Sequence, residues 1–208
     1  MLTNRTYVCI IIVINSERNV FMNVYKNCPI LESENFLLRF VDIGDADDLL
    51  LVYSDLKSVS LFNSDNCGGD DFYYTTIERM KEAIEYWIWE YSRKGFVRWS
   101  IIDKNNKQII GTVELFKRKA KDYFNDCAVL RLDLRSDYEK CNIIAELLCL
   151  IISDTFKIFK CKMIATKAFP QSDERLTALK RVGFKLSDEI LIGTHDRESY
   201  SNYAVAFK

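Results

Sequence analysis

Glycine and proline are scarce in this sequence, which has seven glycines and two prolines, Pro29 and Pro170, among its 208 residues. Linkers between domains are built largely from glycine, proline and serine. No stretch of that composition divides the chain, and it contains no internal repeat or low-complexity tract. The length also fits one domain of common size, about 100 to 200 residues. We therefore expect a single domain over residues 22–208, preceded by an extension over residues 1–21.

Histidine is nearly absent, and cysteine lacks a metal-binding spacing. His195 is the one histidine, and the seven cysteines form no C-x-x-C pair. We therefore expect no zinc site of ordinary composition and predict no metal. An odd number of cysteines without such a pattern is typical of reduced, mostly buried thiols, which predicts a cytoplasmic protein. We interpret Cys141 in the same way, with a reactive thiol as the alternative because it precedes a helix.

A large excess of either charge is also missing. The 29 basic and 30 acidic residues leave a formal net charge of -1 at pH 7. Such a chain has no global field with which to hold nucleic acid or an anionic membrane, so neither is an expected partner. The basic run over residues 117–121 is a candidate local patch. We interpret it as the solvated end of a hairpin.

No hydrophobic run is long enough to cross a membrane. The longest one near the N-terminus covers residues 7–14, whereas a transmembrane helix needs about 20 apolar residues. A signal peptide behind Arg5 is the alternative, but no cleavage site of small residues follows the run. Since Met22 is a second possible start, we interpret residues 1–21 as an extension, or as an added edge strand.

The spacing of apolar residues predicts a mixed sheet with helices on both of its faces. Helical spacing covers residues 46–55 and 76–92, with Asp45 capping the first helix and Thr75 or Thr76 capping the second. Alternation over residues 97–103 and 108–116 predicts a hairpin, and residues 127–134 continue it as a meander. A helix then leads to a strand over residues 162–169, which is parallel to the last meander strand through a right-handed crossover. Another helix, ended by Gly183 as a left-handed cap, precedes two last strands near residues 186–193 and 200–207.

The stretch from Asp126 to Phe156 carries the most functional information. A strand ends at Leu134, a polar break follows, and a segment with helical spacing begins at Ile143. The first backbone N–H groups of a helix have no partner within the helix and bind phosphate readily. The break is therefore a candidate diphosphate-binding loop, and a simple strand-to-helix connection is the alternative.

This loop resembles the acetyl-CoA loop of the GNAT superfamily of N-acetyltransferases, with Lys140, Asn142 and Ile144 in place of the family's glycines. Three further segments resemble the family in the same order along the chain. They are the opening strand and helix start at residues 31–50, the central hairpin at residues 99–115, and the helix ending in Gly183-Phe184. The nearest branch is the one that contains ribosomal-protein and spermidine acetyltransferases.

The resemblance implies an α/β (α+β) fold, in which a largely antiparallel sheet of six or seven strands opens as a V between the fourth and fifth strands. It also implies acetyl-CoA as cosubstrate. The backbone of Leu132, Asp133 and Leu134 would bind the pantetheine arm at the opened edge. The implied diphosphate loop consists of Glu139, Lys140, Cys141, Asn142, Ile143 and Ile144. Ser172 and Arg175 form the implied second cofactor-binding cluster.

The resemblance leaves the catalytic base open. Many relatives carry a glutamate where this chain has Val129, so the nearest carboxylates, Asp133 and Glu114, are the candidate catalytic residues. Asp133 shares a strand face with Val129 and Arg131. The alternative is structural, with Asp133 paired to Arg131 or Arg135. Deprotonation through water would require neither carboxylate.

The sequence thus predicts an acetyl-CoA-dependent N-acetyltransferase that acts directly on a primary amine, as a monomer or homodimer. The acceptor is a small molecule, a polyamine or a peptide N-terminus, and its pocket is expected near residues 57–74. The alternative function is a GNAT scaffold with weakened catalysis that binds CoA or a protein partner.

Overall fold

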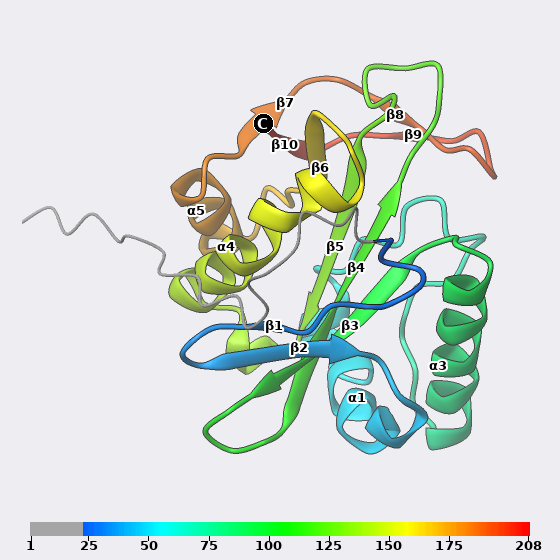
Figure 1. Ribbon diagram of the computed structural model, residues 1–208, viewed down its shortest axis with the longest axis vertical. Helices are drawn as coiled ribbons and strands as arrows, with labels where there is room; N and C mark the ends of the chain where they lie inside the picture. Colours follow the sequence, from blue (N-terminus) through cyan, green and yellow to red (C-terminus); the bar gives the residue numbers. More distant parts are fainter. Residues whose placement is uncertain (1–22) are drawn as a thin grey trace, which may run out of the picture.

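The computed structural model describes residues 23–208, and Figure 1 shows a twisted sheet with α4 and α5 on one side and α1 and α3 on the other. The predicted extension, residues 1–21, lies outside this range. The strands of the main sheet are β1 (Leu31–Glu32), β2 (Phe36–Phe40), β3 (Val97–Asp103), β4 (Ile109–Lys117), β5 (Ala128–Leu134), β6 (Met163–Lys167), β7 (Lys185–Ser187) and β10 (Tyr203–Phe207). The helices are α1 (Ala46–Tyr53), α2 (Leu56–Val59), α3 (Ile77–Ser92), α4 (Cys141–Ile158) and α5 (Asp173–Arg181), with 3-10 turns η1 (Ile43–Asp45) and η2 (Ser136–Tyr138).

The described strands pair in the order β1-β2-β3-β4-β5-β6-β10-β7, and every neighbouring pair is antiparallel except β5 with β6. This confirms the mixed, largely antiparallel sheet and the parallel crossover through α4. The sheet has eight strands rather than six or seven because a tight turn splits the opening strand into β1 and β2. In that turn the backbone N–H of Ser33 donates to the carbonyl oxygen of Phe36 at 2.9 Å.

The last two predicted strands are also shorter than expected. Only β7 and β10 join the main sheet, while β8 (Leu191–Ile192) and β9 (Ser199–Tyr200) form a separate pair. Asn202 has a φ of 61°, which turns the backbone between β9 and β10. Gly183 has a φ of 95° and ends α5, as its predicted left-handed cap requires.

Helix α3 begins where its sequence predicts, because the Thr76 side chain accepts a hydrogen bond from the backbone N–H of Arg79 at 3.2 Å. The predicted cap of α1 is wrong. Asp45 makes no capping hydrogen bond there; it is buried and pairs with Arg39 at 2.5 Å. Asp42, three residues earlier, caps the 3-10 turn instead.

Strand β5 separates two different interiors. Its residues Ala128, Leu130, Leu132 and Leu134 are buried in an apolar core together with one face of α4, including Ile144, Leu147 and Ile151. The alternate residues Arg131 and Asp133 point to the opposite face and are buried as well. A strand buried on both faces loses its alternation in hydropathy, but here charged residues occupy one side.

Pairing between β5 and β6 is short. It joins Ala128, Val129 and Leu130 to residues 164–166 and then stops, although β5 continues to Leu134. The residues beyond this point, Leu132 to Leu134, pair only with β4. The seam between β5 and β6 therefore opens toward the end of β5. These two strands are the fourth and fifth of the predicted sheet, so the predicted V is confirmed.

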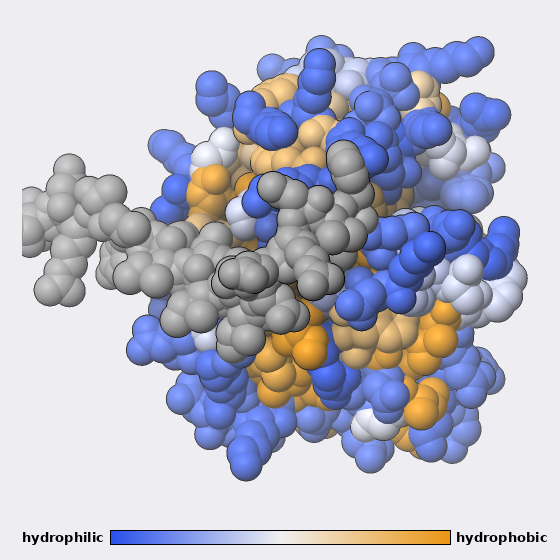
Figure 2. Space-filling model, viewed as in Figure 1, coloured by the Kyte–Doolittle hydropathy of each residue, from blue (hydrophilic) through white to orange (hydrophobic). Residues whose placement is uncertain are grey.

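The surface is mixed in character. Figure 2 shows hydrophilic side chains along the outline of this face and hydrophobic ones in patches between them. This agrees with a chain in which 28% of residues are charged and the two signs nearly balance.

Close contact between β4 and β5 requires glycine at position 111. A Cβ atom there would lie 2.1 Å from the carbonyl oxygen of Asp133 and 3.0 Å from the Cα atom of Leu134. We expect Gly111→Ala to reduce the free energy of unfolding by about 1–3 kcal/mol, since the two strands must move apart. Urea denaturation measures this.

Gly44→Ala is the matched control. A Cβ atom at Gly44 would meet only the side-chain oxygen of Asp42, at 3.1 Å, which can rotate away. We expect a change below about 1 kcal/mol. Equal stability losses in the two variants would contradict the argument.

Candidate functional site

The loop between β5 and α4 adopts a conformation that does not require glycine. No residue from Arg135 to Ile144 has a positive φ. The loop makes one 3-10 turn, and α4 then begins at Cys141. Asn142 and Ile144 consequently lie in the first turn of α4, where ordinary helical dihedral angles apply. The replaced glycines therefore cause no backbone strain.

The three residues that replace the glycines differ in position. The side chain of Ile144 is fully buried in the core beneath α4, so it points away from the outer side of the loop. Lys140 and Asn142 are exposed. The loop is fixed from below by Tyr138, whose hydroxyl donates to the Asp103 carboxylate at 2.9 Å.

The opened seam contains the side chain of Arg175, from the first turn of α5. Its Nη1 atom donates to the carbonyl oxygen of Leu132 at 2.8 Å and to that of Leu61 at 3.4 Å. Its other nitrogens bind the Glu139 carboxylate. Arg175 and Glu139 are 4% and 8% exposed, so this ion pair is enclosed.

The beginning of α4 carries a second carboxylate. Its N-cap residue is Lys140, whose side chain has no acceptor atom and makes no capping hydrogen bond. The backbone N–H of Cys141 donates instead to Oε2 of Glu174 on α5, at 2.6 Å. A carboxylate at this place interacts favourably with the positive end of the helix dipole.

The predicted cofactor-binding residues thus come together in space. The end of β5, the loop, the start of α4 and the start of α5 meet at the open seam. Ser172 is buried there at the start of α5, although its side chain makes no capping hydrogen bond. Glu174 was missed by the sequence argument; its one signal is its position beside Arg175 at a helix start.

A buried ionic cluster lies on the other face of β5. Arg98 donates to the carboxylates of Glu114 and Asp133, the second at 3.1 Å. Its Nη1 atom also binds the hydroxyls of Tyr53 at 2.7 Å and Thr112 at 3.0 Å. These five residues are at most 1% exposed. The cluster ties α1 to β3, β4 and β5.

The charges in this cluster are matched. Arg131 donates to Glu114 at 2.7 Å, so that carboxylate lies between two guanidinium groups. Burial alone would raise the pKa of Glu114, but Arg98 and Arg131 outweigh this effect and hold the pKa below its ordinary value. Burial raises the pKa of the Tyr53 phenol well above its usual range, so Tyr53 stays neutral.

The two candidate catalytic carboxylates are therefore enclosed and bonded. Asp133 is paired with Arg98, not with Arg131 or Arg135 as the structural alternative predicted. Its Oδ2 atom also accepts from Tyr53 at 2.7 Å, while Oδ1 is buried without a hydrogen bond. A base must reach the proton that it removes, so this geometry favours a structural role for Asp133 and Glu114.

Arg98 was missed by the sequence argument. It lies between the apolar residues Val97 and Trp99 of a predicted strand, and a charged residue at such a place was a usable signal. Its guanidinium also lies over the Trp87 ring, 4.1 Å from the ring centroid.

The segment predicted to form the acceptor pocket is attached to the sheet beside this cluster. Asp65 accepts from Nζ of Lys167 at 2.5 Å and from the Tyr203 hydroxyl at 2.9 Å. Arg131 donates to the backbone carbonyl oxygen of Asp65 at 2.8 Å. The loop after α2 is thus held near the end of β6, beside the opening of the seam.

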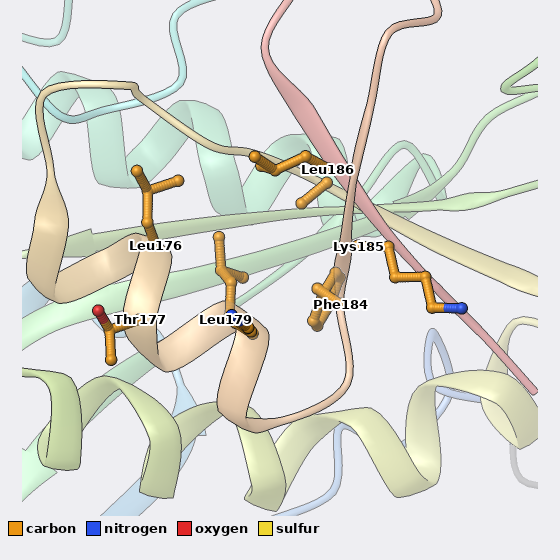
Figure 3. A pocket seen from close by; sticks show the side chains of 8 residues that line it. Leu176, Thr177, Leu179, Phe184, Lys185 and Leu186 are labelled. Atoms are coloured by element: carbon orange, nitrogen blue, oxygen red, sulfur yellow. The ribbon is translucent and has the colours of Figure 1, made fainter.

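A groove lies between α5 and β7, with a volume of about 480 Å³. Figure 3 shows side chains of α5, among them Leu176 and Leu179, near Phe184 and Leu186 of the segment that follows the helix. None of these residues belongs to the predicted cofactor or catalytic set.

The remaining features concern His195, metal-binding groups and membrane-spanning helices. His195 is exposed. Within residues 23–208 no group of three or more His, Cys, Asp or Glu side chains is placed to hold a metal ion. The same residues include no helix with the length and apolar character needed to cross a membrane.

One of the comparisons with known proteins identifies a family. The family model described as an acetyltransferase (GNAT) domain matches residues 35–185. There is no match among curated proteins. Among solved structures, the ribosomal-protein-S5-alanine acetyltransferase from Vibrio fischeri is 17% identical, with a TM-score of 0.63 over 86% of this chain and 96% of that one.

Two further structures have the same fold. RimJ of Mycobacterium smegmatis, in complex with CoA-disulfide, is 14% identical, with a TM-score of 0.62 over 83% of this chain and 81% of that one. A spermidine N-acetyltransferase SpeG chimera from Vibrio cholerae and hSSAT is 14% identical, with a TM-score of 0.59 over 84% and 96%. At these identities the structural likeness shows the fold, while the family model shows the family.

We expect removal of Arg98 to destabilise the protein strongly. Arg98→Met leaves the carboxylates of Glu114 and Asp133 buried with less positive charge beside them. Removal of one partner from a buried ion pair costs about 3–5 kcal/mol of stability. Arg79→Met is the control, because Arg79 makes an ion pair with Asp70 that is partly exposed. Its cost is expected to stay below about 1 kcal/mol. Urea denaturation at neutral pH distinguishes the two, and similar values would refute a structural role for the cluster.

Glu114 also predicts a pH dependence. Its pKa is lower in the folded chain than in the unfolded chain, where it is near the ordinary 4.5. The stability that it contributes is therefore present above about pH 4.5 and is lost as pH falls through the folded pKa. Below pH 4.5, the free energy of unfolding should fall less steeply in Glu114→Gln than in the wild type. Parallel pH profiles would count against this assignment.

Proposed function

The chain belongs to the GNAT family of acetyltransferases, and from this membership we propose that it transfers an acetyl group from acetyl-CoA directly to a primary amine of an acceptor. The domain is that of an acyltransferase, and the family uses acetyl-CoA. The observation that carries the proposal is the open seam, because the backbone of Leu132 to Leu134 has no strand partner on the side of β6.

The cofactor would bind along this seam. In the proposal, the pantetheine arm forms main-chain hydrogen bonds with Leu132, Asp133 and Leu134. The diphosphate lies at the start of α4, on residues 139–144, where backbone N–H groups and the exposed Lys140 favour an anion. Ser172 and Arg175 line the same place from α5 and are the further proposed contacts.

The chemistry then requires positioning more than a reactive side chain. The amine attacks the carbonyl carbon of the thioester, CoA leaves as the thiolate, and the amine loses a proton. Holding both reactants in line supplies a large part of the rate enhancement. Hydrogen-bond donors at the seam stabilise the charge that develops on the carbonyl oxygen.

Proton removal is assigned to water or to an acceptor that arrives as the free amine. Asp133 and Glu114 are candidate bases by position in the sequence, but their contacts with Arg98 support an indirect role. In this role they fix β4 and β5 in register beside the seam, so that the backbone of β5 is correctly placed.

The acceptor is assigned only by class. A small molecule, a polyamine and a peptide N-terminus all present a primary amine, and the loop fixed by Asp65 lies at the mouth of the seam. Structures with this fold carry names of both ribosomal-protein and spermidine acetyltransferases. We place the protein in the cytoplasm because its seven cysteines form no metal-binding pattern and their number is odd. We propose a monomer or homodimer, and the near-zero net charge favours no nucleic acid as a partner.

A second candidate function is a GNAT scaffold with weakened catalysis that binds CoA or a protein partner. The specific observation in its favour is that Glu174 and Arg175 already occupy hydrogen-bonding positions that the cofactor would use, with Arg175 held in place by Glu139. Binding of acetyl-CoA without turnover of any amine would favour this candidate.

Isothermal titration with acetyl-CoA, followed by thiol release with a panel of amines, tests the proposal. We expect the wild type to bind and to release thiol with at least one amine. Lys140→Glu and Asn142→Glu should weaken binding about tenfold, because each adds negative charge at the start of α4.

Lys157→Glu is the control for charge, since Lys157 is exposed near the opposite end of the same helix. Its affinity for acetyl-CoA should stay near that of the wild type. If the wild type binds no acetyl-CoA, or if all three substitutions weaken binding equally, the proposed seat of the diphosphate is wrong.

A further inference from the structure

Two adjacent side chains at the start of α5 occupy the main-chain groups that the proposed cofactor site depends on. Glu174 accepts the hydrogen bond of the Cys141 backbone N–H at 2.6 Å. Arg175 donates to the carbonyl oxygen of Leu132 at 2.8 Å. The first group lies at the proposed diphosphate seat, and the second lies on the proposed pantetheine edge.

Each contact imitates one part of the cofactor. The Glu174 carboxylate is an anion at a helix N-terminus, as a phosphate would be. The Arg175 N–H group supplies the donor that an amide of the pantetheine arm would supply to the same carbonyl. A bound diphosphate would also lie next to the negative charge of Glu174, and the two like charges would repel each other.

The closed arrangement is held by a third residue. Glu139 forms the enclosed ion pair with Arg175, which keeps the guanidinium inside the seam. Because Glu174 and Arg175 are neighbours in one helical turn, a small movement of that turn releases both contacts together.

The groove between α5 and β7 borders the part of α5 that follows this turn. Figure 3 shows α4 on one side of α5 and the groove toward β7 on another. The groove has a volume of about 480 Å³ and is lined by Leu176, Leu179 and Leu186, among others. Glu174 itself is exposed, so its side chain has room to leave the start of α4.

We propose that the first turn of α5 is an autoinhibitory latch, in which Glu174 and Arg175 close the cofactor site and acetyl-CoA binds only after the turn has moved. This inference rests on the proposed function. The apparent dissociation constant then equals the intrinsic one divided by the open fraction. A change that weakens the latch raises the open fraction and strengthens binding.

Glu174→Gln tests the latch, because it keeps the size of the side chain and removes the charge. Asp173→Asn is the matched control: Asp173 is exposed in the same turn, loses the same charge, and makes no hydrogen bond to α4 within the described residues. Binding of coenzyme A and, separately, of inorganic pyrophosphate is measured by isothermal titration for both variants and the wild type.

We expect coenzyme A to bind Glu174→Gln about fivefold more tightly than the wild type, with Asp173→Asn within about twofold of the wild type. If all three proteins bind coenzyme A equally, or if both variants gain equally, the latch is refuted while the proposed function stands. If none binds coenzyme A, the proposed function fails, and pyrophosphate decides the latch separately. Tighter pyrophosphate binding by Glu174→Gln alone supports it, and equal or undetectable binding overturns it.

Discussion

The main-chain carbonyl of Leu132 has no strand partner on the side of β6, and the arrangement of the site follows from this one constraint. Strand pairing between β5 and β6 ends at Leu130, yet β5 continues into the interior of the protein. A buried carbonyl without a hydrogen bond is costly, so some donor must enter the seam. In this structure the donor is Arg175, which in turn requires Glu139 as a counter-charge. In the proposed complex the donor is the pantetheine arm.

The absence of glycine from the loop has a different meaning once its backbone is known. Glycine is needed where φ is positive or where a ligand approaches the backbone closely. Residues 135–144 have no positive φ, and Ile144 points into the core. The loop therefore loses only the close approach of a ligand to its backbone. It also differs from a glycine loop in the charge that its side chains carry. Lys140 favours an anion at the start of α4, whereas the Glu174 carboxylate competes with such an anion for the Cys141 backbone N–H.

The ionic cluster around Arg98 explains how β5 keeps a fixed position beside an open seam. Two carboxylates and two guanidinium groups are buried on one face of the sheet, with hydroxyls of Tyr53 and Thr112 completing the hydrogen bonds. Such clusters cost desolvation and add little net stability over apolar packing. Their geometry is directional, however, so they fix the register of β3, β4 and β5 where the seam leaves β5 without support.

The sequence alone determined the order of the elements, the crossover through α4 and the family, because hydrophobic spacing and the four resembling segments are local properties of the chain. The same resemblance also predicted which residues lie around the seam. It did not determine the partners of charged side chains. Asp133 pairs with Arg98, and Glu174 reaches Cys141 from 33 positions away along the chain. Only the tertiary structure decided these contacts, since the energy of an ion pair depends on distance and burial, which no local pattern records.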